Sequence, residues 1–289
     1  VRDRERPFFL FVCFHEPHEP IATSDEYAAL YPSEDPSLSA HHGNITQMDA
    51  AFGRLMARLE AEGLSGSTLV WFTSDNGPAK TRWHPHGSSG PLREYKGHLY
   101  EGGIRVPGIV RWPGRIEPGS VSSEPVSGVD LLPTLCAVAG VDVPADRVLD
   151  GANCVPILTG GRIERAKPLY WQFNYASAEP DSVVRKGPWE VVATLDRPEF
   201  PRGADITPEM MTALKSAEPT AFELYNLADD VGEQSDVQSS VPAVCERLKE
   251  ELIAMYHEVR EESPVWPAWE WPRYESQRIE WPTYRPPGR

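Results

Sequence analysis

Two short apolar runs on either side of a helical pattern constrain the fold of this 289-residue chain most strongly. Residues 8–12 and residues 68–72 are uninterrupted stretches of aromatic, aliphatic and β-branched side chains. Such runs are typical of strands that are covered on both faces, as in a parallel sheet. Between them, apolar residues recur at steps of three and four from Ile45 to Leu59, which predicts a helix that ends near Gly63. This order of strand, helix and strand predicts a right-handed βαβ crossover and an α/β fold.

Two further elements complete the predicted α/β part. Residues 108–112 form another short apolar run, which predicts a strand. A helix is then expected, with Asp130 as its N-cap and Gly140 at its end. We assign these elements to one α/β domain over residues 1–165.

The sequence changes character after about residue 165. Short apolar runs separated by turns predict antiparallel strands, with a hairpin around residues 186–188 and a closing helix over residues 241–259. We therefore expect a small antiparallel α+β subdomain over residues 166–262. A tail rich in Trp and Pro follows over residues 263–289. We interpret it as a strap across the surface, with a carbohydrate-stacking or oligomer contact as the alternative; no oligomeric state is predicted.

The acidic balance of the chain limits its partners. A formal net charge of −15 argues against nucleic acid, because nucleic-acid binding needs a basic surface. The longest apolar run, over residues 8–14, is far too short to cross a bilayer. The four cysteines form no C-x-x-C pair, and Cys13 and Cys136 lie in apolar runs where small core residues are expected.

Asp75 and Asn76 stand where the second apolar run gives way to a loop. Ligands of open α/β sheets bind beyond the carboxyl ends of strands. A carboxylate and an amide carbonyl are hard oxygen donors that suit Ca²⁺ or Mg²⁺. The alternative is an ordinary Asx-turn, which the sequence Asp-Asn-Gly favours by itself.

Basic and imidazole side chains near these residues could bind an anion. Lys96 offers a compact charge for an anionic oxygen, although a solvated surface lysine is the simpler interpretation. His15 and His18 lie in a proline-rich loop after the first apolar run, where an imidazole could donate to an oxyanion. His86 and Arg93 help to make the loop before Lys96 locally basic, which suits capture of an anionic substrate.

Taken in order, the motifs resemble those of the sulfatase family. They are His-x-Pro-His-x-Pro, Ser-Asp-Asn-Gly, Lys-Gly-x-x-x-Glu-Gly-Gly-x-Arg-Val-Pro and Asp-Leu-Leu-Pro-Thr-Leu. The resemblance extends over about residues 7–237 and is to arylsulfatase-like and N-acetylgalactosamine-6-sulfatase-like members. It implies an alkaline-phosphatase-like fold, with a mostly parallel sheet flanked by helices and a smaller antiparallel sheet plus helix towards the C-terminus. Within the third motif, Glu101 and Arg105 resemble structural partners that shape the loop.

The resemblance also implies roles for individual residues. Asp75 and Asn76 match calcium ligands of the family. Lys96 matches its sulfate-binding lysine, which stabilises the leaving or bridging oxygen. His18 matches a histidine that contacts the sulfate, whereas His15 lies at a position that varies in the family. Lys96 and His18 are therefore the expected catalytic residues, and one Ca²⁺ is the expected cofactor.

The departures from the family pattern concern the nucleophile. That group is a formylglycine made from Cys or Ser in a C/S-x-P-x-R motif, and we expect the motif to be missing here. Residues 154–158 keep the Cys and the Pro without the Arg and resemble a downstream structural segment, so Cys154 is rejected. The family's paired aspartates and its Lys-x-x-His element find no match. We therefore expect the C-terminal portion of a longer sulfatase, with further metal ligands upstream and no activity by itself.

The implied function is that of a calcium-dependent sulfuric-ester hydrolase. Its expected substrates are sulfated carbohydrates or aryl sulfates, and the family implies a periplasmic or secreted location. A phosphodiesterase or phosphonate hydrolase of the same superfamily is one alternative, and a non-catalytic binding relative is another. The motif around Lys96 favours sulfate, as does the lack of additional His and Asp metal ligands.

Overall fold

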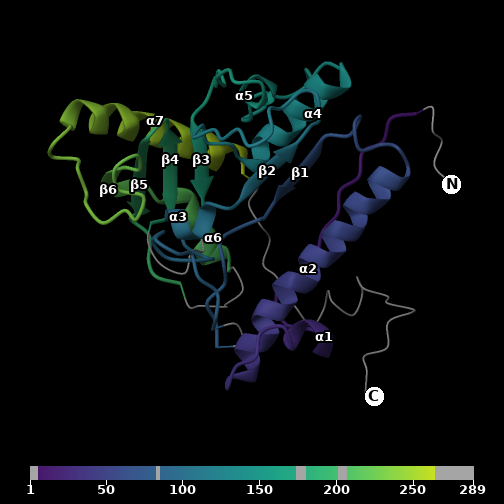
Figure 1. Ribbon diagram of the computed structural model, residues 1–289. Coiled ribbons are helices and arrows are strands. Elements are labelled where there is room, and N and C mark those ends of the chain that lie inside the picture. The colour runs from purple at the N-terminus through teal and green to yellow at the C-terminus, as the bar shows by residue number, and fades with distance from the viewer. Residues whose placement is uncertain (1–5, 83–84, 174–179, 201–206, 264–289) are drawn as a thin grey trace. The chain divides into compact units, whose positions relative to one another are not determined.

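The computed structural model describes residues 6–82, 85–173, 180–200 and 207–263 (Figure 1). The chain divides into two compact units, Val1–Lys167 and Pro168–Arg289, and each has its own secondary structure. The predicted tail over residues 263–289 lies outside the described residues apart from Ser263.

The first unit contains helices and one small sheet. In chain order its elements are α1 (Asp25–Ala28), α2 (Pro36–Ala61), β1 (Val70–Thr73), α3 (Glu101–Ile104), β2 (Gly108–Arg111), the 3₁₀ helix η1 (Gly128–Asp130), α4 (Leu131–Ala139) and α5 (Val155–Leu158). The predicted strand at residues 108–112 and the predicted helix before Gly140 are confirmed. Gly140 ends α4 in the left-handed conformation, with φ of 68°.

The long helix α2 confirms the periodicity seen in the sequence. It begins earlier than the apolar pattern because Asp35 caps it, accepting a hydrogen bond from the amide of Ser37 at 2.9 Å. It ends at Ala61, and Gly63 follows with φ of 68°. Phe52 of α2 packs edge-on against Phe72 of β1, with ring centroids 5.4 Å apart. This ring contact joins the apolar side of α2 to β1.

The predicted parallel crossover is not found in the described part of the first unit. β1 pairs with β2 in antiparallel register, from Val70 opposite Arg111 to Thr73 opposite Gly108 (Figure 1). Residues 8–12 join neither sheet and are exposed, with Phe9 at 70%. An apolar run indicates that the side chains of a segment are to be buried by other elements. It specifies neither the partner strand nor the direction of that strand.

One expectation about a single residue in this unit is wrong. Cys13 is exposed, because the run that contains it is not packed into the described core. Asp130 occupies the predicted N-cap position of α4, but its side chain makes no cap bond to that helix. Its buried carboxylate instead forms an ion pair with Arg165 at 2.6 Å and accepts from the amides of Ser127 and Ala152, each at 2.8 Å.

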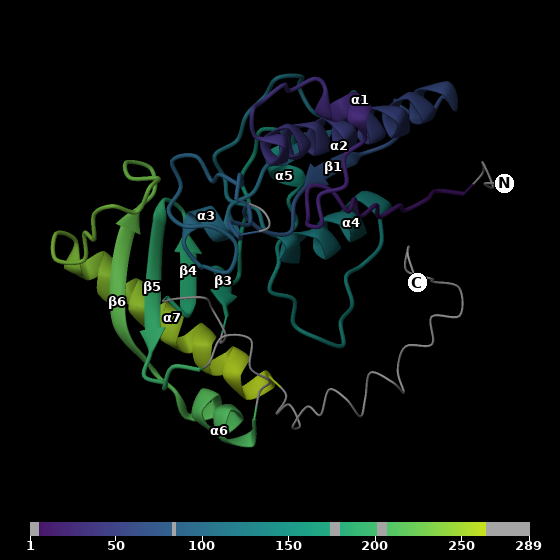
Figure 2. The same cartoon turned by 90° about the horizontal axis from the view of Figure 1, so that it is seen from below.

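The second unit is an antiparallel sheet with a helix against it. Its elements are β3 (Leu169–Gln172), β4 (Ser182–Lys186), β5 (Trp189–Leu195), α6 (Pro208–Ser216), β6 (Pro219–Asn226) and α7 (Pro242–Glu262). The strands lie in the order β3-β4-β5-β6, and α7 crosses one face of the sheet (Figure 2). Val184, Val191 and Leu224 of the sheet form a buried core with Leu248 and Leu252 of α7.

The structure confirms the predicted hairpin and closing helix of this unit. Gly187 joins β4 to β5 with φ of 59°, a conformation that favours glycine. The helix α6 was not predicted, so the described subdomain has two helices where one was expected. In the part of the chain that the structure describes, no helix is both long enough and apolar enough to cross a membrane.

Candidate active site

The first group of predicted site residues lies just beyond the carboxyl end of β1. Asp75 is exposed and Asn76 is half-buried. The Asn76 side-chain amide donates to the carbonyl oxygen of Gly77 at 2.9 Å, so its nitrogen is directed at the backbone. The amide oxygen is therefore the atom that remains for a cation.

Two backbone hydrogen bonds join this loop to the loop that carries Lys96. The amide of Gly77 donates to the carbonyl oxygen of Gly103 at 2.8 Å, and the amide of Lys96 donates to that of Pro78 at 2.9 Å. The approach is so close that a β carbon at Gly77 would lie 1.9 Å from the carbonyl oxygen of Gly102. Backbone hydrogen bonds thus connect the loop that carries the candidate metal ligands, Asp75 and Asn76, to the loop that carries the candidate anion-binding residue, Lys96.

The helix α3 fixes the shape of the second loop. Glu101 is buried, and its carboxylate pairs with the guanidinium of Arg105 at 2.9 Å, which confirms the expected structural pair. The guanidinium of Arg93 lies 3.6 Å from the ring centroid of Tyr100, while its carbonyl oxygen accepts from the amide of Gly102 at 2.7 Å. Arg93 therefore supports its own loop, whatever else it contacts.

The two histidines of the first loop are both exposed, with ring centroids 6.3 Å apart. Nδ1 of His18 lies 2.6 Å from the carbonyl oxygen of Glu19, and a carbonyl can only accept, so Nδ1 carries a proton. A neutral His18 can then only accept at Nε2. Donation from Nε2 to an anion requires the protonated ring.

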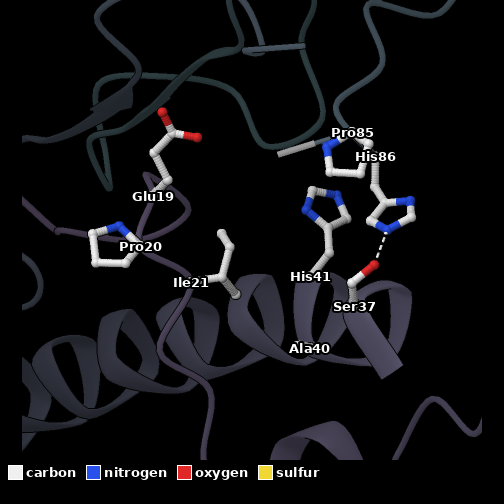
Figure 3. Close-up of a pocket in the computed structure, with 8 residues that line it drawn as sticks. All are labelled: Glu19, Pro20, Ile21, Ser37, Ala40, His41, Pro85 and His86. Carbon is white, nitrogen blue, oxygen red and sulfur yellow. Dashed lines mark hydrogen bonds between the residues drawn. The ribbon is translucent and has the colours of Figure 1, made fainter. Parts of the chain in front are cut away.

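His86 lies in a separate part of the first unit, on a cavity of about 480 Å³ (Figure 3). Its polar lining residues are Glu19, Ser37, His41 and His86. Its apolar lining residues are Pro20, Ile21, Ala40 and Pro85. The cavity adjoins His18 through Glu19, and Thr81 donates to the Glu19 carboxylate at 2.9 Å. No sequence pattern indicates that Glu19, Ser37 and His41 meet His86, because these residues come from three distant segments of the chain.

The predicted metal site is incomplete among the described residues. No group of three or more His, Cys, Asp or Glu side chains is arranged there to hold a metal ion. Asp75 and Asn76 provide two oxygen donors, whereas calcium takes about six to eight. These residues therefore fit only part of a calcium site.

One match to the nucleophile motif was overlooked in the sequence. Residues 89–93 read Ser-Gly-Pro-Leu-Arg, which satisfies S-x-P-x-R. The Ser89 hydroxyl is directed at the carbonyl oxygens of Leu92 at 3.0 Å and Glu94 at 2.8 Å. The Leu92 amide donates to the backbone carbonyl oxygen of Ser89 at 3.2 Å. Ser89 thus closes a turn, and this environment does not present its hydroxyl as a nucleophile.

The rejection of Cys154 agrees with its surroundings. Its side chain is fully buried, and burial together with the nearby Asp130 carboxylate raises the pKa of the thiol to about 11. Its amide donates to the Thr134 hydroxyl at 2.9 Å, which ties the segment to α4. A side chain at position 154 is therefore closed off from a substrate, which the nucleophile must reach.

Comparison with known proteins agrees with the order of motifs. Residues 1–141 match the sulfatase family model. Human arylsulfatase A is 35% identical over 257 residues, which are 86% of this chain and 48% of that protein. The chain spans less than half the length of the curated relatives that it matches.

Solved structures share the fold. Ps i-CgsB in complex with k-i-k-neocarrahexaose has a TM-score of 0.73 and 25% identity, covering 94% of this chain and 54% of that one. A phosphonate monoester hydrolase of Agrobacterium radiobacter has a TM-score of 0.51 and 24% identity, covering 77% of this chain and 42% of that one. The second likeness shows a common fold alone.

This chain belongs to the sulfatase family, whose members are sulfuric-ester hydrolases. The predicted alkaline-phosphatase-like fold class is confirmed by its structural neighbours. In the described residues that fold is represented by the small β1–β2 sheet with its helices and by the four-stranded antiparallel sheet with α7.

Proposed function

We propose that this chain carries the metal- and sulfate-binding half of a sulfatase active site. Asp75 and Asn76 are the proposed metal ligands, and Lys96 and His18 are the proposed sulfate ligands. The observation that carries the proposal is the pair of backbone hydrogen bonds that joins the Asp75–Asn76 loop to the Lys96 loop. Such a connection keeps the cation site at Asp75 and Asn76 at a constant position relative to the Lys96 loop. Transfer of an anionic group requires positive charges that are positioned in advance in this way.

The roles of these side chains follow from their chemistry. The Lys96 ammonium would stabilise negative charge on the sulfate or on the departing oxygen. A protonated His18 would donate from Nε2 to a sulfate oxygen, because its Nδ1 proton is engaged by the Glu19 carbonyl. A divalent cation held partly by Asp75 and Asn76 would neutralise further charge on the sulfate. Calcium is the proposed ion because all the donors are hard oxygens.

The proposed substrate class is a sulfated carbohydrate or an aryl sulfate. Of the two remaining predicted substrate ligands, His86 lines the cavity next to Glu19 and Arg93 stacks on Tyr100. We propose Arg93 as a further substrate ligand, and its stacking on Tyr100 is compatible with that role. We also propose that these 289 residues alone do not hydrolyse sulfate esters. The support is that Cys154 is buried, that Ser89 closes a turn, and that the described residues offer only two candidate metal ligands, Asp75 and Asn76.

The same-superfamily alternative is hydrolysis of a phosphonate or phosphate ester. A phosphonate monoester hydrolase shares the fold, but the matched family model and the motif around Lys96 favour sulfate. A non-catalytic binding protein is the other alternative.

Hydrolysis assays test the proposal. The isolated chain should release no 4-nitrophenol from 4-nitrophenyl sulfate above the level of a Lys96→Ala variant. If the coding region upstream of Val1 extends in frame and encodes paired aspartates with C/S-x-P-x-R, the longer protein should be active. Lys96→Ala should then lower its kcat by about 10²–10³-fold, as expected for loss of a group that stabilises transition-state charge. Lys96-independent turnover by either protein would contradict the assignment.

A further inference from the structure

The segment that carries His18 has no regular secondary structure of its own. Residues 6–24 precede α1 and form neither a helix nor a strand in the described part of the chain. The local structure at the histidine is a turn, in which the amide of His18 donates to the carbonyl oxygen of His15 at 2.9 Å. A segment with few backbone hydrogen bonds opens easily unless other elements hold it. The position of His18 therefore depends on the contacts that this segment makes elsewhere.

One face of α2 provides such contacts. It is formed by four residues at the helical spacing i, i+3, i+4 and i+7, which are Ala40, Gly43, Asn44 and Gln47. The Thr23 hydroxyl donates to the carbonyl oxygen of Ala40 at 2.6 Å. The side-chain amide of Asn44 donates to the carbonyl oxygen of Ala22 at 3.2 Å. A β carbon at Gly43 would lie only 2.8 Å from Cγ2 of Thr23, so the segment passes close to the helix. Figure 3 shows Ile21 of the same segment beside α2.

Gln47 makes the largest number of side-chain contacts from this face to the segment. Its Nε2 donates to the Glu16 carboxylate at 3.1 Å and to the carbonyl oxygen of Ala22 at 3.2 Å. Its Oε1 accepts from the amide of Ser24 at 3.0 Å. A primary amide has two N–H donors and one carbonyl acceptor, so both ends of the group are engaged. Glu16 precedes His18 in the chain, whereas Ala22 and Ser24 follow it, so one side chain holds the segment on both sides of the histidine.

We propose that Gln47 is a positioning residue, which holds the turn of His18 where the imidazole can donate to a sulfate ester. This inference rests on the proposed function for the role of His18. A second anchor lies directly after the histidine, where the Glu19 carboxylate accepts from the Thr81 hydroxyl at 2.9 Å. Thr81 belongs to the loop that follows Asn76, so the turn is tied both to α2 and to the loop of the candidate metal ligands. Holding the turn in advance removes the entropy that binding would otherwise lose in ordering it.

A double-mutant cycle in the 289-residue chain tests this role by calorimetry, with 4-nitrophenyl sulfate as the probe and Ca²⁺ present. His18→Ala should weaken binding about tenfold, as expected for loss of a hydrogen bond to a charged group. Gln47→Met keeps the length of the side chain and removes its hydrogen bonds. It should weaken binding about three- to fivefold, because a released turn keeps part of the His18 contact. In the His18→Ala background, Gln47→Met should change the affinity by less than about twofold, because Gln47 acts through His18.

A matched control and a second readout complete the test. Thr46 is the neighbouring residue of α2, and its hydroxyl lies 2.6 Å from that of Tyr31, which is outside residues 16–24. Thr46→Val should therefore leave binding unchanged in both backgrounds. Amide hydrogen exchange reports the turn without any ligand. Gln47→Met should speed exchange of the His18 amide and leave that of the Lys96 amide unchanged, because the latter donates to Pro78 in a different loop.

The outcomes separate the two proposals. If Gln47→Met binds like the wild type, or weakens binding equally with and without His18, the positioning role is refuted. If the wild type does not bind, or His18→Ala binds equally well, the sulfate role of His18 is refuted instead. Exchange of the His18 amide then decides by itself whether Gln47 holds the turn, and an unchanged rate in Gln47→Met would show that it does not.

Discussion

Gly77 and Gly102 lie back to back, so closely that a β carbon on Gly77 would come within 1.9 Å of the carbonyl oxygen of Gly102. The contact allows the loop after β1 to lie against α3 and to hydrogen-bond with Gly103. Neither backbone has room to accept a methyl group without moving. Glycine at position 77 is therefore what allows the Asp75–Asn76 loop to lie this close to the Lys96 loop, whereas a β carbon on Gly102 would meet the carbonyl oxygens of Glu94 and Arg93.

Replacing Gly77 by alanine should separate these loops. The added methyl group meets backbone and not a flexible side chain, so we expect destabilisation of about 1–3 kcal/mol or more. Urea unfolding monitored by tryptophan fluorescence measures the effect. Gly53→Ala is the matched control, because a β carbon there meets nothing within 4 Å and alanine favours the helix α2. Equal stability of the Gly77 variant and the wild type would contradict the tight packing.

The buried ion pair between Arg165 and Asp130 should contribute strongly to the stability of the first unit. Asp130 is fully buried, and removing its cation leaves an uncompensated carboxylate. Arg165→Met should therefore cost about 3–5 kcal/mol in the free energy of unfolding. Arg147→Met, which breaks an exposed pair with Asp146, should leave it essentially unchanged, because solvent screens an exposed ion pair. Similar losses in both variants would show that burial of the pair is unimportant.

The same carboxylate should make stability depend on acid pH. Burial by itself would raise the pKa of Asp130, but the hydrogen bonds from Arg165 and from two backbone amides outweigh it and lower the pKa. A group with a lowered folded-state pKa stabilises the fold above its unfolded value, here 3.8. That contribution is lost as the pH falls below about 4 towards the folded-state pKa. Asp130→Asn should flatten the stability profile in that window, and an unchanged profile would refute the assignment.

Thiol labelling should distinguish two of the cysteines sharply. Cys13 is exposed, whereas Cys154 is buried and has a pKa raised to about 11. Iodoacetamide at pH 8 should therefore modify Cys13 in the folded chain and leave Cys154 intact. Mass spectrometry of tryptic peptides reports both sites, and labelling in urea provides the control in which both react. Fast modification of Cys154 in the folded chain would mean that its segment opens readily.

Local patterns in the sequence were sufficient for elements whose signals are local. The period of apolar residues predicted α2, and Gly140 and Gly187 marked a helix end and a hairpin turn. Strand direction was not predictable, because the run over residues 68–72 carries no information about whether β2 would pair with it antiparallel. Residues 8–12 show the same limit: their apolar character is clear and their partner is not.

The sequence predicted candidate site residues only where a recognisable motif lies next to a predicted strand or a glycine. Asp75, Asn76 and Lys96 stand out because they follow strand and glycine signals along the chain. The hydrogen bond between Ser37 and His86 joins residues 49 positions apart, and no spacing rule connects them. The role of Gly77 likewise depends on a carbonyl oxygen 25 residues away (102 − 77 = 25), so its necessity appears only in the folded structure.

The most direct test of the proposed half-site is a calorimetric titration of the 289-residue chain with 4-nitrophenyl sulfate in the presence of Ca²⁺. Sulfate-ester binding should be measurable in the wild type and lost in Lys96→Ala. Lys80→Ala, which removes an exposed lysine from the neighbouring loop, should bind like the wild type and excludes a general charge effect. Binding that survives Lys96→Ala, or no binding by the wild type, would contradict the assignment of Lys96 to a sulfate site.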